Sequence, residues 1–174
     1  MNPTLPHGVK SCTHYRPDGS RQAIALDQVK ALLNNDEGFV WIGLYEPDMA
    51  ALQQMQALFN LHPLAIEDAA KAHQRPKVES FDDVLFVVVH TTQQIEQKLR
   101  YGETHLFLGK RFLITIRHAA SLSYEPVRER LELEPGLLRL GPSVCLYAVL
   151  DAVVDIYLLI TDQLTQSLDA LEKD

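Results

Sequence analysis

The stretch Phe39–Phe59, FVWIGLYEPDMAALQQMQALF, places a strand directly before a helix. Residues 39–44 are a short, continuous apolar run of the kind that marks a buried strand. Glu46-Pro47-Asp48 follows the run and opens a helix predicted over 48–59. One face of that helix is apolar and carries Met49, Leu52, Met55, Leu58 and Phe59.

Apolar runs, caps and turn residues predict further elements on both sides of this unit. The expected strands are 9–15, 84–91, 104–108 and 112–117, with a tight turn at 109–111 joining the last two. The first further helix is expected at 27–34, capped by Asp27 and ended by the turn at 35–38. Two more are expected at 63–72, starting at Pro63, and at 124–133. A last helix should run from Ser143 almost to Asp174. Strands followed by C-terminal helices indicate an α/β sandwich with a helical extension.

The last helix divides the chain into a predicted α/β domain at 1–142 and the start of a helical stalk at 143–174. Residues 144–160 are apolar except for Asp151 and Asp155, so we expect this part to be enclosed. A carboxylate at the centre of a lone membrane helix costs about 2.5–3.5 kcal/mol, which argues against a membrane span here. Leu164, Leu168 and Leu171 continue as a narrower apolar seam without a stop signal, and we expect a truncated helix.

The composition is that of a globular domain, with 47% hydrophobic and 22% charged residues among 174. The net charge of −7 excludes a nucleic-acid partner, because there is no basic stripe to neutralise phosphates. Cys12 and Cys145 are too far apart for metal-ligand spacing. The histidines form no zinc-enzyme motif, and no nucleophile elbow, P-loop or dinucleotide fingerprint occurs. The sequence therefore predicts no enzyme. His90 and His105 could meet across neighbouring strands, but the favoured interpretation is that each is a structural histidine with its hydrogen bonds satisfied within the sheet.

Carboxylates are the residues that the elements leave unexplained. Glu67 and Asp68 lie in the middle of a short helix, beyond the first turn where the helix dipole favours negative charge. Asp151 and Asp155 are four residues apart on a helix and repel each other unless a positive charge lies between them. Carboxylates from different elements would form a weak Mg²⁺ site. Composition alone favours the other interpretation, in which these acids are solvated side chains that pair with lysine and arginine.

Several motifs in order resemble the CorA family of divalent-metal transporters. They begin with HPLAIED at 62–68 and QRPKVE at 74–79, and continue with FLITIRH, which ends a strand at 112–118. Further along come PVRERL at 126–131, GLLR at 136–139 and LYAVLDAVVD at 146–155. The resemblance covers about residues 39–174. It departs from the family at Asp83-Val84, where many relatives carry an aromatic residue before the strand.

The resemblance implies an α/β/α sandwich with a mixed central sheet, followed by C-terminal helices that lead into a long stalk. It also implies a homopentameric channel in the inner (plasma) membrane, with this domain on the cytoplasmic side. Regulatory Mg²⁺, with Co²⁺ or Zn²⁺ as alternatives, would bind weakly between neighbouring subunits and hold the pore closed. The family's metal ligands match Asp68 here and, for a second ion, Glu67 and Asp151. Their common partner is an aspartate further along the stalk helix.

We therefore expect the metal-sensing domain of a Mg²⁺/Co²⁺-type transporter, cut off before its membrane helices. Alone, such a chain would be monomeric or weakly associated and would meet the membrane only through the missing C-terminal part. The alternatives are the zinc-transporting branch of the same superfamily and a stand-alone oligomerisation module that needs no metal. A soluble enzyme with an acidic active site is a further alternative.

Overall fold

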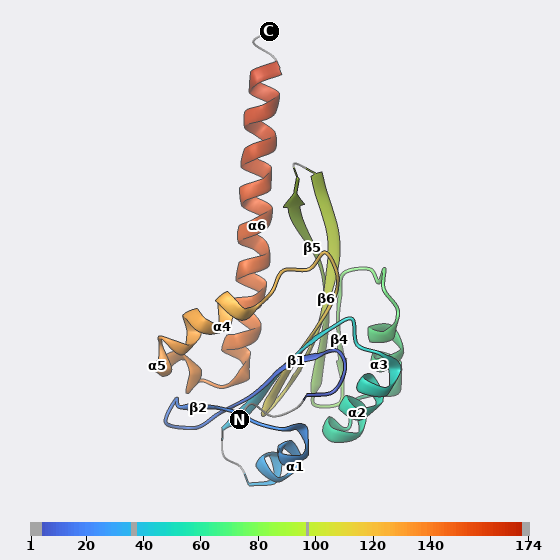
Figure 1. Cartoon of the computed structure of the whole chain (residues 1–174), viewed down its shortest axis with the longest axis vertical. Coiled ribbons are helices and arrows are strands. Elements are labelled where there is room, and N and C mark those ends of the chain that lie inside the picture. Colours follow the sequence, from blue (N-terminus) through green and yellow to red (C-terminus); the bar gives the residue numbers. More distant parts are fainter. Residues whose placement is uncertain (1–4, 36–37, 97, 172–174) are drawn as a thin grey trace.

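A seven-stranded mixed sheet organises the protein in a computed structural model that describes residues 5–35, 38–96 and 98–171 (Figure 1). The strand order is β2-β1-β3-β7-β6-β5-β4, and among these described strands β3 and β7 pair in parallel while the other neighbours are antiparallel. The strands are β1 Val9–Tyr15, β2 Arg21–Ala23, β3 Phe39–Tyr45, β4 Lys77–Phe81, β5 Val84–Ile95, β6 Lys98–Gly109 and β7 Phe112–Ala119. The expected mixed sheet is confirmed.

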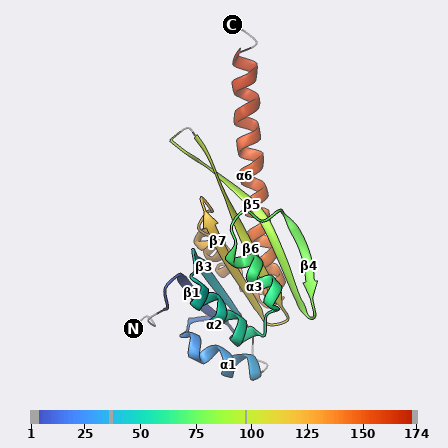
Figure 2. The same ribbon diagram turned by 90° about the vertical axis from the view of Figure 1, so that its right-hand side faces the viewer.

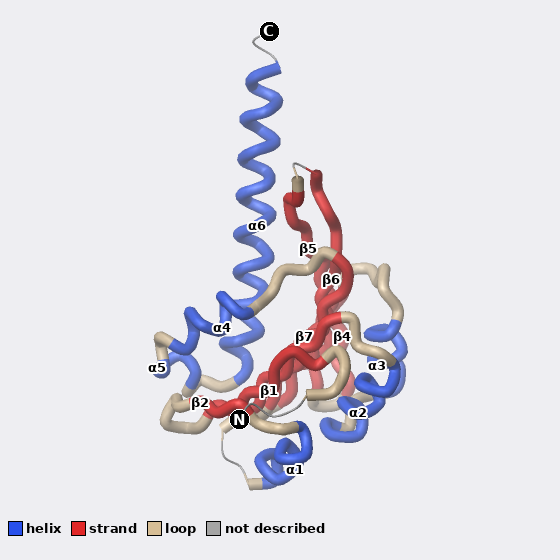
Figure 3. Tube along the Cα trace, in the orientation of Figure 1, coloured by secondary structure: helices blue, strands red, loops and turns tan. Residues whose placement is uncertain are grey.

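Helices cover both faces of the sheet, as Figures 2 and 3 show. One face packs against α1 (Leu26–Asn34), α2 (Met49–Phe59) and α3 (Pro63–Ala70). The other packs against α4 (Glu125–Glu132), α5 (Pro135–Leu138) and the lower part of α6 (Pro142–Leu171). The predicted α/β/α sandwich is therefore confirmed, whereas the division at residue 142 stays a prediction.

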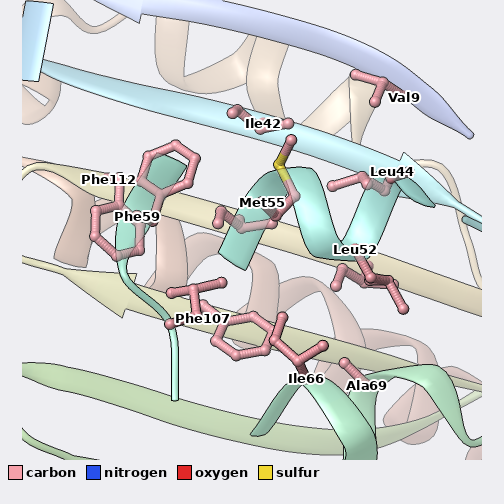
Figure 4. Close-up of a cluster of buried hydrophobic side chains, with 14 of the residues drawn as sticks. Val9, Ile42, Leu44, Leu52, Met55, Phe59, Ile66, Ala69, Phe107 and Phe112 are labelled. Carbon is pink, nitrogen blue, oxygen red and sulfur yellow. The ribbon is translucent and has the colours of Figure 1, made fainter. Parts of the chain in front are cut away.

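Strand β3 explains why its sequence is apolar without alternation. Val40, Ile42 and Leu44 point to the α1–α3 face and contribute to its core. Figure 4 shows Ile42 and Leu44 within this core. Phe39 and Trp41 point to the opposite face and join the second core under α4–α6. Because successive side chains of a strand alternate between faces, a strand that is buried on both faces reads as a continuous apolar run.

Most predicted elements are present, but two predicted helix starts are wrong. Asp27 does not cap α1, because Ala25 is the N-cap residue and Asp27 lies in the first turn. Helix α6 begins at Pro142 rather than at a Ser143 cap. The fixed φ of proline suits a first-turn position, where its missing N–H is not needed. The predicted turn at 35–38 falls partly outside the described residues, as does the last turn toward Asp174.

The sheet is also larger than the sequence predicts. Strands β2 and β4 extend its two edges, and the β5–β6 hairpin continues well past the predicted ends at Thr91 and Thr104. Of the departure from the family pattern, Asp83-Val84, Asp83 lies in the turn between β4 and β5 and Val84 begins β5. Asp82, in the same turn, has φ +50°.

Helix α6 is enclosed only in part, contrary to expectation. Cys145, Val149 and Val153 are buried against the sheet, whereas Val154, Leu158 and Leu159 are each more than half exposed. The helix then projects beyond the sheet as an isolated rod (Figure 1). Helix α6 is the one helix among the described residues long and apolar enough to cross a membrane, by length and composition alone, and 33% of its most apolar window is buried.

Candidate functional site

Helix α3 holds Glu67 and Asp68 in a defined position because both of its ends are tied down. At its start, His62 is the N-cap residue, and its Nδ1 accepts a hydrogen bond from the Leu64 amide at 3.2 Å. The His62 ring also stacks on Phe81 of β4, with 4.6 Å between ring centroids. At its end, the Ala69 carbonyl oxygen lies 3.1 Å from His118 Nε2. The HPL motif is thus a capped helix start.

Asp68 forms an ion pair with a lysine from the adjacent edge strand. Lys77 Nζ lies 2.6 Å from Asp68 Oδ2 and 2.8 Å from Glu79 Oε2. Hydrogen bonds to Asp68 and Glu79 raise the pKa of the Lys77 ammonium. The two motifs of the sequence, HPLAIED and QRPKVE, therefore meet in one contact.

The loop between α3 and β4 is held in place by the buried carboxylate of Glu103. Glu103 Oε1 accepts a hydrogen bond from the His73 amide at 2.7 Å, and Oε2 accepts one from the Gln74 amide at 3.1 Å. His90 Nε2 lies 2.9 Å from the Gln74 carbonyl oxygen. Buried carboxylates are stable when backbone amides satisfy them. Glu103 thereby fixes the path that brings Lys77 to Asp68.

Glu67 forms a more exposed ion pair with Lys71, four residues further along the chain. The hydrogen bond that the Lys71 ammonium donates to Glu67 Oε1 raises the pKa of Lys71. Both side chains are more than half exposed. Exposed pairs of this kind contribute little to stability, so Glu67 can exchange its partner at low cost.

Asp151 lies on α6, in the layer on the other side of the sheet from α3. Its Oδ2 is 3.6 Å from Arg130 of α4, and its side chain is 39% exposed. Two helices of one layer thus supply this pair. Asp155, one turn further along α6, is exposed to solvent.

The structure brings Glu67 and Asp68 together but places Asp151 apart from them. No group of three or more His, Cys, Asp or Glu side chains that could hold a metal ion occurs within the described ranges. The sequence did not identify the basic partners Lys77 and Arg130, although the i,i+4 spacing of Glu67 and Lys71 was readable.

The buried histidines and cysteines do not supply a metal site either. His105 lies opposite Val88 in the β5–β6 pairing, while His90 lies opposite Glu103, so His90 and His105 are not directly paired across the two strands. The neighbour of His105 is His118, at 5.1 Å between ring centroids. Burial raises the pKa of the Cys12 and Cys145 thiols to about 12, which keeps both protonated and unreactive.

Comparison with known proteins identifies the family. The profile of the family described as CorA-like Mg²⁺ transporter protein matches residues 36–174. The chain belongs to this family. The CorA-like chain is also 31% identical, over 140 residues, to the cobalt/magnesium transport protein CorA of Thermotoga maritima; the match covers 77% of the chain and 39% of that relative.

Solved structures show the same fold. The full-length CmaX protein superposes with a TM-score of 0.77 at 17% identity, covering 96% of the CorA-like chain and 51% of CmaX. The soluble domain of CorA from Methanocaldococcus jannaschii superposes with a TM-score of 0.69 at 17% identity, covering 94% and 63%. The chain spans less than two thirds of the length of these relatives. The family is one of transporters rather than enzymes.

Proposed function

We propose that this chain is the cytoplasmic, metal-sensing domain of a divalent metal ion transporter of the Mg²⁺/Co²⁺ type. Family membership supports transport, and the positions of three carboxylates support sensing. Glu67, Asp68 and Asp151 are all accessible to solvent, with side-chain exposures of 58%, 27% and 39%. They lie in two layers on opposite sides of one sheet.

This placement favours a site shared between copies of the chain. A single copy cannot bring α3 and α6 acids onto one ion, whereas the α3 layer of one copy can face the α6 layer of a neighbour. Hard cations such as Mg²⁺ bind one or two carboxylates while they keep several waters. Asp68 would therefore hold one Mg²⁺ weakly, Glu67 and Asp151 would hold a second, and Co²⁺ or Zn²⁺ could take the place of either.

Electrostatics explain how such an ion would act as a switch. The chain carries a net charge of −7, so facing acidic surfaces repel each other. A divalent ion between them reverses the sign of that interaction. A ligand that binds the associated state better shifts the population toward it. In our proposal, bound Mg²⁺ holds a homopentamer closed in the inner membrane, and loss of the ion loosens it.

The test is Mg²⁺ inhibition of ion flux through the full transporter that contains this domain. We expect Asp68→Ala to weaken the inhibition, because it removes a ligand that only the inhibited state uses. The matched control is Asp83→Ala, which changes an exposed acid in the β4–β5 turn. Mg²⁺ should inhibit flux through this variant as strongly as through the parent. Unchanged inhibition in Asp68→Ala would contradict the proposal.

The alternative functions predict different experimental results. Flux of Zn²⁺ in preference to Mg²⁺ and Co²⁺ would place the protein in the zinc-transporting branch. A stand-alone oligomerisation module predicts that Mg²⁺ gives no thermal stabilisation, or a stabilisation that Asp68→Ala leaves intact. The exposed apolar side chains of α6 are the observation that favours this module.

A further inference from the structure

A cleft of about 340 Å³ lies between α4 and the sheet, in the layer opposite α3. We call it the α4 cleft; its floor is formed by Ser11, Gly43 and Thr115. These residues lie side by side across three strands, because Ser11 pairs with Gly43 and Gly43 pairs with Thr115. Two positions earlier on β3, the same face carries Trp41, which fills the space beneath α4.

Gly43 keeps the floor of the α4 cleft open. A Cβ atom at this position would lie 2.8 Å from Ser11 Oγ, closer than real Cβ atoms approach. The hollow is therefore built into the strand register: Gly43 lies between the small residues Ser11 and Thr115, whereas the large Trp41 lies two positions earlier on β3.

Positive side chains stand around this floor. The Arg128 guanidinium of α4 lies over the Trp41 ring at 4.6 Å from its centroid, and the Arg117 guanidinium of β7 lies over Tyr45 at 5.1 Å. Lys10 Nζ lies 5.9 Å from the same Tyr45 centroid. Lys10 precedes Ser11, at the irregularity where the β1–β3 register shifts between Val9 and Ser11. Three cations thus converge from β1, β7 and α4.

Both guanidinium groups lack a full set of partners in the described part of the chain. Arg128 Nη1 donates to Thr13 Oγ1 at 3.4 Å, and its buried Nε has no hydrogen-bond partner. Arg117 Nη1 donates to the Ser121 carbonyl oxygen at 3.4 Å. No ion pair to a carboxylate is formed by either arginine among these residues, and burial lowers the pKa of both. Guanidinium groups held this way have donors left for an anion.

Acidic residues at the cleft limit what can enter. Glu132 is already engaged by Arg21 and by Tyr15, whose hydroxyl donates to Oε1 at 2.8 Å. Glu125 and Glu129 line the cleft from exposed positions on α4. These exposed carboxylates repel a long polyanion, whereas a small anion can reach the arginines between them.

We propose that the α4 cleft binds a phosphate group, either free inorganic phosphate or the phosphate of a small molecule. Arg117, Arg128 and Lys10 supply the charge, and the Ser11 hydroxyl donates from the floor. Guanidinium groups match phosphate oxygens with paired N–H donors. The volume lies at the lower end of small-molecule pockets, about 300–1,000 Å³, and leaves room for a small organic group beside the phosphate.

The test titrates inorganic phosphate into the 174-residue chain at constant ionic strength and follows tryptophan fluorescence. Trp41 is the only tryptophan of the chain and lies directly beneath Arg128, so an anion on Arg128 changes its emission. We expect a saturable change, and Kd values raised about tenfold in Lys10→Gln and in Arg117→Gln, as expected for loss of a charge-assisted contact.

Arg130→Gln is the matched control, because Arg130 lies two residues after Arg128 on α4 but pairs with Asp151. Its Kd should equal that of the parent. Lys10 is exposed, so Lys10→Gln keeps the fold and tests the proposal even if Arg117→Gln does not fold. An equal response to chloride, or an equal loss in the control, would overturn the proposal. Tighter binding of glycerol phosphate than of inorganic phosphate would identify a phosphorylated small molecule, and equal binding would identify free phosphate.

Discussion

Lys77 Nζ lies 2.6 Å from Asp68 Oδ2, so the carboxylate that we propose as a metal ligand already has a cation beside it. Lys77 also contacts Glu79 at 2.8 Å. The lysine therefore neutralises two acids at the edge of the sheet. A divalent ion that binds Asp68 must displace this ammonium or work against its charge.

The first prediction follows from this competition. Lys77→Met should increase the affinity for Mg²⁺ severalfold, because it leaves the Asp68 and Glu79 carboxylates without a local cation. Thermal stabilisation as a function of Mg²⁺ concentration measures the effect. Lys71→Met, which removes the partner of exposed Glu67, is the control and should change the affinity less. Equal Mg²⁺ affinity in Lys77→Met and the parent would argue against Asp68 as a ligand.

Arg111 gives a second prediction, about the end of α1. Its guanidinium donates to the carbonyl oxygens of Leu32 at 2.9 Å and Gly38 at 3.0 Å, and also to Leu33. Arg111→Met should lower the free energy of unfolding by about 2 kcal/mol, because carbonyls at a helix end lose a charged donor. Urea unfolding measures this change in the free energy of unfolding. Lys110→Met, at the neighbouring exposed position, should stay within about 0.5 kcal/mol of the parent.

The third prediction concerns pH. Burial lowers the pKa of His105 from 6.5 to about 3, with the nearby His118 adding to the shift. The charge of Asp68 acts in the opposite direction without cancelling the shift, and Glu103, at 3.5 Å, is occupied by two backbone amides. His105 is therefore neutral in the folded chain, and the unfolded chain binds more protons between pH 6.5 and about 3.

Stability should accordingly fall as the pH drops below 6.5, by about 2 kcal/mol between pH 7 and pH 5 from this group. Urea unfolding at the two pH values measures the change. His105→Leu should remove most of this loss, whereas His90→Leu, at an exposed position, should retain it. The same pH dependence in His105→Leu and the parent would show that another group is responsible.

The fourth prediction concerns the exposed apolar side chains of α6. Leu158 and Leu159 are each 59% exposed, and apolar surface of this kind favours association. Replacing both by glutamine should weaken self-association of the chain at high concentration, as measured by sedimentation. Gln163→Ala, further along the same exposed helix, should leave association unchanged. Identical sedimentation of all three proteins would exclude this part of α6 as a contact.

The sequence predicted elements where hydrophobic periodicity reports burial. Strand 39–44 and helix 48–59 were predictable because both bury apolar side chains in the core. Strand β2 was not, because its three residues are all exposed and only pairing with β1 defines it. The outer half of the β5–β6 hairpin is likewise largely polar, and its backbone pairing leaves no apolar pattern in the sequence.

The contacts of the candidate site likewise divide into those that the sequence predicts and those that it does not. The spacing of Glu67 and Lys71 predicts their contact because helix geometry relates them directly. The contact of Asp68 with Lys77 depends on the path of the intervening loop, which Glu103 fixes from a distant strand. Arg130 reaches Asp151 from another helix. Tertiary packing determines both of these pairs, so no local pattern could indicate them.

The placement of Asp68 and Asp151 on opposite layers has a consequence for stoichiometry. Under the proposed function, each ion belongs to a contact between two copies rather than to a copy. Two associated copies contain one such contact, whereas a closed ring contains as many contacts as copies. For each of the two proposed sites, the number of bound ions per chain therefore rises from one half in a pair of copies to one in a closed ring. Counting ions thus reports whether the assembly is open or closed.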